Sequence, residues 1–111
     1  MSNKWESVQA TLDSWVEAAF ESGDLPGDGS EHDVERWVHE TADGCEFVIW
    51  WSEVMDIWNS SPEVQDFEWS AAECFTAHQS ILERMTIVVF LAIEDHLRVS
   101  IQEYEMELER A

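Results

Sequence analysis

The C-terminal stretch from Ala71 to Arg110 contains neither glycine nor proline, and it constrains the fold more than any other part of the chain. Residues of one stripe recur along it every three or four positions, which is the spacing of one face of an α-helix. The β-branched segment 86–91 is compatible with a strand when taken alone, but its unbroken flanks favour one long helix. The stripe comprises Phe75, His78, Leu82, Met85, Val89, Ala92, Ile93, Leu97, Ile101, Tyr104 and Leu108.

The length of this stretch also predicts a shape. Forty helical residues, from 71 to 110, span about 60 Å. That is several times the radius of gyration of about 13 Å expected for a globule of this chain length. We therefore expect an elongated molecule whose apolar middle is covered by a second copy.

The N-terminal part has the same periodicity. Apolar residues between Trp5 and Phe20 predict an amphipathic helix over roughly residues 4–22, with Ser2 or Asn3 as its cap. The following segment 23–29 is rich in glycine and contains a proline, which is typical of a loop.

Further helices are predicted in the middle of the chain. Ser30 starts a second helix, which ends or kinks at Gly44. The apolar run 47–51 is ambiguous between strand and helix, but its continuation to Trp58 favours a helix. The Ser61–Pro62 pair starts another helix. Together these elements predict an all-α, elongated helical domain over residues 1–111 with a long C-terminal helix.

The charge balance restricts the partners. The chain carries 25 Asp and Glu against 5 Lys and Arg, a formal net charge of −20. It has no basic patch with which to bind nucleic acid, and anionic membranes should repel it. Basic protein surfaces are the expected partners. Adaptation to high salt is an alternative, although 17 Glu against 8 Asp and seven Trp count against it.

Redox and targeting features are few. Cys45 and Cys74 are too few for a disulfide framework, so we expect two reduced thiols in a cytoplasmic protein, here the cytoplasm of a host cell. The sequence begins without an apolar run, and no run of 18 apolar residues follows, so we expect neither a secretory leader nor a membrane span.

Residues 24–35 match part of the pattern of a calcium-binding loop. Asp24, Asp28, Gly29 and Glu35 match positions one, five, six and twelve of such a loop, but Pro26 stands where a third ligand is needed. An acidic interhelix loop is the simpler interpretation, with a calcium-responsive structural protein as the alternative.

Other metal and catalytic patterns are weaker still. His39–Glu40 followed by Asp43 resembles half of a zinc-binding helix, and Cys74 and His78 are one helical turn apart. Neither pattern has enough ligands, and no Ser or Cys nucleophile carries a recognisable signature. We therefore expect no metal, no cofactor and no enzymatic activity.

The carboxylates themselves are the remaining signal. Ordinary solvated helix faces mix both signs of charge, whereas basic partners are nearly absent here. Like charges on one helix face weaken the helix by a few tenths of a kcal/mol per pair. Because the chain carries many such pairs, the negative field itself is expected to be functional. The predicted partner-binding acids are Asp33, Glu35, Glu40, Asp43, Glu46, Glu53, Asp56, Glu63, Asp66, Glu68, Glu94, Asp95, Glu103, Glu105 and Glu107.

The negative charge of this chain can be compared with the charge along duplex DNA. A duplex carries one charge per ~1.7 Å of axis, so a two-fold dimer with about −40 matches roughly 20 base pairs. A stiff helical rod of this charge could occupy the basic groove of a DNA-binding enzyme.

The chain also resembles the Ocr-like family of phage antirestriction proteins. The resemblance is carried by segment 33–43, by Trp50–Trp51 and Val54–Met55, by Thr86–Ile87 with Glu83 before it, and by the acid-rich end from Glu94 to Glu109. Segment 33–43 has an Asp and an aliphatic residue, then an aliphatic–His pair and an Ala–Asp pair at the family's spacing. The chain departs from the family in the more apolar segment 88–91 and in lacking an all-acid tail.

The resemblance implies a homodimeric DNA mimic that inhibits a type I restriction-modification enzyme by occupying its DNA-binding groove. It also implies a small apolar dimer interface near the middle of the molecule, at Val54, Met55, Ile57 and Trp58, with segment 87–91 as a further contributor. The alternatives are an anti-CRISPR or another acidic inhibitor of a DNA-binding defence complex, and a halophile-type acidic or calcium-responsive structural protein.

Overall fold

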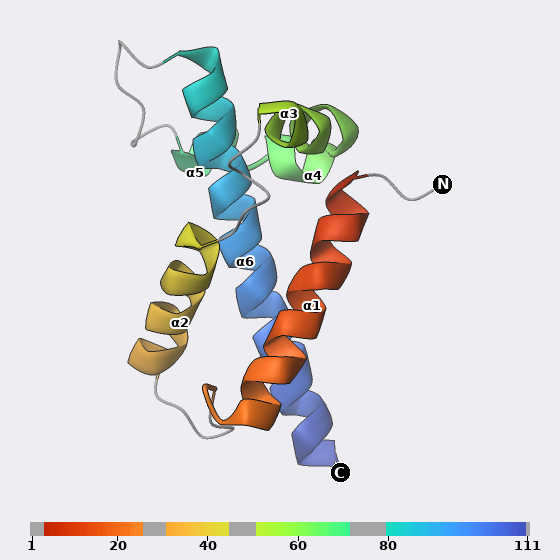
Figure 1. The fold of residues 1–111 in the computed structure, drawn as a ribbon, viewed down its shortest axis with the longest axis vertical. Helices are drawn as coiled ribbons and strands as arrows, with labels where there is room; N and C mark the ends of the chain where they lie inside the picture. The colour runs from red at the N-terminus through yellow and green to blue at the C-terminus, as the bar shows by residue number, and fades with distance from the viewer. Residues whose placement is uncertain (1–3, 26–30, 45–50, 72–79, 111) are drawn as a thin grey trace.

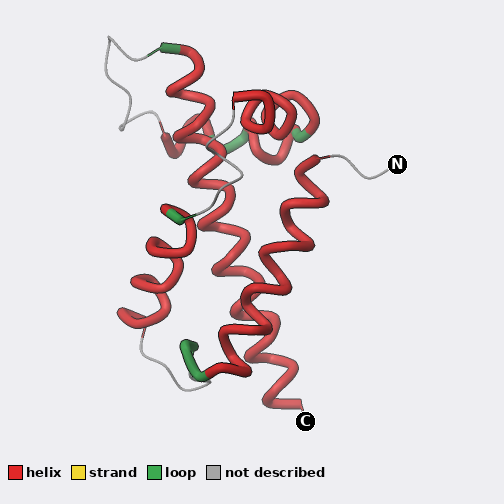
Figure 2. The backbone as a smooth tube through the Cα atoms, in the orientation of Figure 1, coloured by secondary structure: helices red, strands yellow, loops and turns green. Residues whose placement is uncertain are grey.

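The computed structural model describes residues 4–25, 31–44, 51–71 and 80–110, and in these segments the chain is almost entirely helical, with no strand. Figure 2 shows helices joined only by short loops in that part of the chain. The all-α prediction is confirmed. The helices are α1 (Lys4–Ser22), α2 (Glu31–Asp43), α3 (Trp51–Ser60), α4 (Pro62–Gln65), α5 (Glu68–Ala71) and α6 (Ile81–Arg110).

Helix α6 is the axis of the molecule (Figure 1). Its 30 residues span about 45 Å, close to the longest extent of the fold, which measures 47 × 34 × 21 Å. The radius of gyration is 14.7 Å. The predicted long C-terminal helix is therefore present, and the molecule is longest along it.

The predicted start of this helix was wrong. We expected one helix from Ala71 to Arg110, whereas α5 ends at Ala71 and α6 begins at Ile81. Ser80 is the physical reason, because its hydroxyl accepts a hydrogen bond from the Glu83 amide at 3.2 Å and so caps a new helix. Residues 72–79, including Cys74, Phe75 and His78, lie outside the described residues.

The other helices surround α6 on different sides. Helix α1 runs beside its C-terminal half in the same direction, since Gln9 contacts His96 and Phe20 stacks on Tyr104. Helix α2 lies along the opposite side and runs in the reverse direction, and α3, α4 and α5 gather around the N-terminal half of α6. None of the helices in the described segments is long and apolar enough to cross a membrane.

The core lies where these helices meet α6. Its fully buried members come from α1 and α6, from α2, and from the helices around the N-terminal half of α6. They include Leu12, Val16, Val38, Val54, Ile57, Val64, Val88, Ile93 and Leu97. Burial of these side chains is what holds several short acidic helices against one another.

Two helix boundaries agree closely with the sequence. Helix α1 covers Lys4–Ser22 as predicted, and it ends at Gly23, whose φ of +89° turns the chain so that Leu25 is buried. Ser61 caps α4, because the Val64 amide donates to its hydroxyl at 3.4 Å and Pro62 occupies the first helical position.

Candidate functional site

The predicted partner-binding acids lie on every described helix but α1. Asp33, Glu35, Glu40 and Asp43 belong to α2, whereas Glu46 lies outside the described residues. Glu53, Asp56, Glu63, Asp66 and Glu68 lie on or next to α3, α4 and α5, and Glu94, Asp95, Glu103, Glu105 and Glu107 lie on α6. They are thus distributed around the molecule and do not form one ridge.

Four of these acids form ion pairs with basic residues of the protein itself. Lys4 pairs with Glu53 at 3.3 Å and Arg36 pairs with Asp33 at 3.3 Å. Arg98 on α6 engages Glu35 and Glu94, and therefore fastens α2 to α6. Carboxylates held in this way offer less negative charge to a partner.

The contacts of Arg98 form the strongest of these interactions. Two of its three guanidinium nitrogens, Nε and Nη2, lie 2.8 Å from the two carboxylate oxygens of Glu35, a bidentate arrangement. The hydrogen bond from Arg98 lowers the pKa of Glu35, and the same bond raises the pKa of Arg98. His39 Nδ1 lies 3.2 Å from Glu94, which extends the network along α2.

A group of four carboxylates without a lining Lys or Arg from the described residues lies between α1 and α6. A surface hollow of about 250 Å³ lies between the C-terminal halves of these two packed helices, and we call it the α1–α6 hollow. Four exposed acids line it: Asp13 and Glu17 from α1, and Glu103 and Glu107 from α6. No Lys or Arg of the described residues lines this hollow.

The floor of the α1–α6 hollow is less polar than its rim. Val16 is buried, Tyr104 is half-buried and stacks on Phe20 at 4.5 Å, and Ser100 is 7% exposed. Each acid pair is spaced by one helical turn, so the hollow has a row of carboxylates along each of two parallel helices.

His96 fixes one end of this hollow. Its Nε2 lies 2.8 Å from Asp13 and its Nδ1 lies 3.4 Å from the side-chain amide of Gln9. A neutral imidazole with its proton on Nε2 satisfies both contacts, because Nε2 then donates to Asp13 and Nδ1 accepts from Gln9. The contact with His96 thereby holds Asp13 in place.

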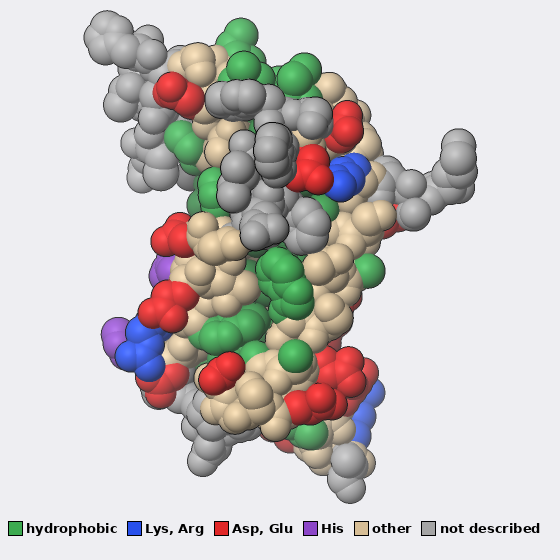
Figure 3. All heavy atoms as spheres, viewed as in Figure 1, with side chains coloured by type: hydrophobic (Ala, Val, Ile, Leu, Met, Phe, Trp, Pro, Cys, Tyr) green, Lys and Arg blue, Asp and Glu red, His purple; other side chains and the backbone are tan. Residues whose placement is uncertain are grey.

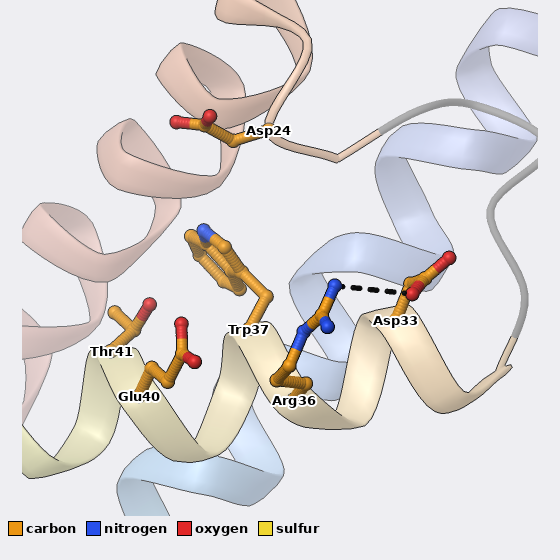
Figure 4. Close-up of a pocket in the computed structure, with 6 residues that line it drawn as sticks. All are labelled: Asp24, Asp33, Arg36, Trp37, Glu40 and Thr41. Carbon is orange, nitrogen blue, oxygen red and sulfur yellow. Dashed lines mark hydrogen bonds and ion pairs between the residues drawn. The ribbon is translucent and has the colours of Figure 1, made fainter.

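Two other hollows differ in carrying an arginine. One lies between α2 and α6 and is lined by Glu31, Glu35, Glu105 and Arg98, among others. The other lies at α2 beside Asp24, where Trp37 stands between Asp24 and the ion pair of Arg36 and Asp33 (Figure 4). In both, a cation of the chain itself already accompanies the acids.

The surface view agrees with this distribution. Figure 3 shows acidic side chains along the outer edge of α2, interrupted by basic and histidine side chains. A second gathering lies at the lower right of that face, over the lower ends of α1 and α6, with a basic side chain at its edge. Acidic side chains therefore outnumber basic ones at the lower end of this face.

The residues predicted to form a dimer interface lie in two environments. Val54 and Ile57 are completely buried in the protein's own core, because α3 packs them against α6. Met55 is 42% exposed and Trp58 is half-buried. Of these four, only Met55 and Trp58 therefore present surface that a second copy could cover. In the further segment 87–91, Val88 and Val89 are buried, and Ile87, Phe90 and Leu91 are half-buried.

Metal sites find no support in the described segments. No group of three or more His, Cys, Asp or Glu side chains there could hold a metal ion. In the calcium-loop pattern, Glu35 is engaged by Arg98, and Asp28 and Gly29 lie outside the described residues. In the zinc-like pattern, His39 contacts Glu94 and Glu35.

Sequence reasoning missed the α1 side of the hollow. Asp13 and Glu17 lie on the polar face of the amphipathic helix predicted for residues 4–22 and are not among the predicted partner-binding acids. Their four-residue spacing repeats that of Glu103 and Glu107, and this shared spacing was the available signal. No known family, curated protein or solved structure matches the chain.

Proposed function

We propose that this protein is a DNA mimic that occupies the basic DNA-binding groove of a restriction-modification enzyme and catalyses nothing itself. The observation that carries the proposal is the α1–α6 hollow, where two rows of exposed carboxylates flank a groove that no basic residue of the described chain lines. Two rows of phosphates flank a groove in duplex DNA in a comparable way.

The charge density supports the same proposal. A net charge of −20 over a longest extent of 47 Å is one charge per about 2.4 Å, against one per ~1.7 Å in a duplex. The carboxylates sit on packed helices, so little conformational entropy is lost when they dock. A type I enzyme is the first target to test, because the sequence resembles the Ocr-like antirestriction family.

Competition with DNA tests the proposal. Purified protein is added to a type I restriction-modification enzyme bound to labelled target DNA, and displacement is measured between 50 and 200 mM salt. We expect displacement that weakens steeply with salt, because association driven by many charge contacts loses affinity as salt rises. Other DNA-binding defence complexes are assayed in parallel, and cytochrome c serves as a basic protein without a DNA groove.

Matched variants locate the surface. Replacing Asp13, Glu17, Glu103 and Glu107 by their amides should weaken displacement by roughly fourfold to about a thousandfold, since exposed charge pairs contribute about 0.2–1 kcal/mol each. The control replaces Asp56, Glu63, Asp66 and Glu68, which removes the same charge from the other end. Equal losses for both variants would contradict the placement of the binding surface at the α1–α6 hollow, whereas failure to displace DNA from every complex would contradict the proposed function itself.

A further inference from the structure

We propose that the exposed side of the C-terminal half of α6 is the docking surface for one basic amphipathic helix of the partner protein. This inference rests on the proposed function, because it names the element with which a DNA-binding partner would contact the acidic end of the molecule. The surface consists of the exposed residues Asp95, Val99, Gln102, Glu103 and Met106, and we call it the α6 stripe.

Exposed apolar side chains gather at this end of the described chain. Five large hydrophobic residues are exposed within the described segments, and three of them lie between residues 99 and 108 of α6. Val99 is 41% exposed and Met106 is 52% exposed, although the segment around them is rich in glutamate. Two apolar positions one heptad apart on an otherwise polar helix face are the pattern of a helix–helix contact.

The α6 stripe continues an apolar line that the core covers earlier in the helix. Ala92, Val99 and Met106 are spaced by seven residues and so share one side of α6. Ala92 is 1% exposed, and α3, α4 and α5 gather around that N-terminal half only. Further along, Gln102 borders the hollow towards α2 and Glu103 borders the hollow towards α1. The side between these two hollows is left open by the described helices.

The spacing of the apolar residues favours a helical partner. Val99 and Met106 are two turns apart, or about 10 Å along the helix axis. A second helix that lies along α6 can contact both with apolar side chains that are also one heptad apart. The partner therefore needs only one apolar side, which is the definition of an amphipathic helix.

The charges beside the apolar positions favour a basic partner. Asp95 and Glu103 are exposed on either side of Val99 along the helix, and the α1–α6 hollow next to the stripe adds further acids without a Lys or Arg from the described residues. Lys or Arg beside the apolar seam of the partner helix would lie against these acids, as charged residues do beside the seam of a coiled coil. DNA-binding proteins often place a basic helix in the major groove, where it meets phosphates and thymine methyl groups. The α6 stripe offers carboxylates and apolar side chains in their place.

The same charges disfavour a second copy of this chain as the occupant. Each copy carries a net charge of −20, and two α6 stripes would bring acids against acids. A basic helix gains from the contact that a second copy would have to overcome.

An NMR titration of the full ¹⁵N-labelled chain tests the inference. The probe is a three-heptad peptide with Leu at position a, Ala at position d and Lys at positions e and g. The control peptide has the same residues in a permuted order that leaves no apolar side. We expect saturable amide shifts centred on residues 95–107 with the amphipathic peptide, and at least roughly tenfold weaker binding of the permuted peptide. Equal binding of the two peptides, or shifts spread over all helices, would overturn the inference.

Val99→Thr combined with Met106→Gln is the decisive variant, because it changes no charge and closely preserves side-chain shape. We expect it to weaken binding of the amphipathic peptide roughly tenfold, since less apolar surface is removed from water. The loss should persist at 0.5 M NaCl, where salt screens the charge contacts. Met55→Gln, at an exposed methionine on α3, is the matched control and should change binding less than about twofold. Equal effects of the two variants would remove the α6 stripe as a specific surface.

Sedimentation of the chain alone tests the other occupant. A dimer that Val99→Thr with Met106→Gln converts to monomer would assign the α6 stripe to a second copy and overturn the inference. An unchanged mass in this variant supports a different partner on the stripe.

The two proposals fail separately. If the protein displaces DNA but the two peptides bind equally, the DNA-mimic proposal stands and this inference falls. If the amphipathic peptide binds the α6 stripe and the double variant weakens it, but no DNA-binding enzyme is displaced, the docking surface stands and the proposed function falls.

Discussion

Individual carboxylates of this protein have different uses that depend on the rare basic residues near them. Glu35 and Glu94 were expected to face a partner, yet Arg98 lies between them and engages both. Glu103 and Glu107, two turns further along α6, have no such neighbour in their hollow. The position of one arginine therefore separates structural acids from acids available for binding.

The Glu35–Arg98 pair predicts a pH-dependent stability difference. The hydrogen bond from Arg98 lowers the pKa of Glu35, so its stabilising effect is complete above the unfolded-state pKa of about 4.3 and disappears as pH falls through the lowered folded-state pKa. Glu35→Gln should therefore lower the free energy of unfolding at pH 7, by about 1 kcal/mol or less for such a partly exposed pair. The difference from the original chain should shrink below pH ~4.

Urea unfolding of both chains at pH 7, 4.5 and 3 measures this difference. Glu31→Gln is the matched control, because Glu31 lines the same hollow on the same helix and lacks the bidentate contact. A difference that stays constant or grows towards pH 3 would contradict the assignment to Glu35.

For individual helices, the apolar periodicity predicted the helix bounds correctly where a helix-breaking residue followed it. Helix α1 was predicted to its residue bounds because Gly23 ends a regular apolar stripe. The start of α6 was missed because no glycine or proline separates it from α5. Ser80 followed by Glu83 is a helix-start signature that composition alone does not reveal.

The arrangement of helices was less predictable than their bounds. Periodicity shows which residues share a face of one helix, but it does not show which helices become neighbours. Asp13 and Glu17 join Glu103 and Glu107 only because α1 packs beside the C-terminal half of α6. The site depends on that long-range packing and therefore could not be assembled from the sequence.

The Ser80 cap predicts a measurable contribution to stability. Ser80→Ala removes the acceptor for the Glu83 amide and should lower the free energy of unfolding by about 1 kcal/mol. Urea unfolding with circular dichroism measures the change. Ser7→Ala, at an exposed position inside α1, is the control and should change stability by less than about 0.5 kcal/mol. A cost no larger than that of Ser7→Ala would show that the cap contributes nothing.

At the scale of the molecule, the sequence predicts a two-fold dimer. The exposed Met55 and the half-buried Trp58 are the surface parts of the predicted interface on α3. Two protomers of net charge −20 repel each other, so association should strengthen as salt screens the repulsion. Sedimentation equilibrium at 0.05 and 0.5 M NaCl tests this, with Met55→Glu expected to favour the monomer. A mass that is monomeric at every salt and protein concentration would exclude the dimer.

The same repulsion acts within each protomer and predicts an unusual response of stability to salt. Five basic residues cannot neutralise 25 acids, so like charges on neighbouring helices oppose the burial that holds α1 and α2 against α6. The screening length falls from about 10 Å at 0.1 M to about 3 Å at 1 M salt, so NaCl should raise the urea midpoint progressively. Salt also strengthens apolar burial in general, and a variant separates the two causes. Replacing the eight acids of the two matched sets, around the α1–α6 hollow and on α3 to α5, should make the midpoint higher at low salt and less dependent on salt. If that variant and the original chain respond to NaCl equally, self-repulsion is not what limits the stability of this fold.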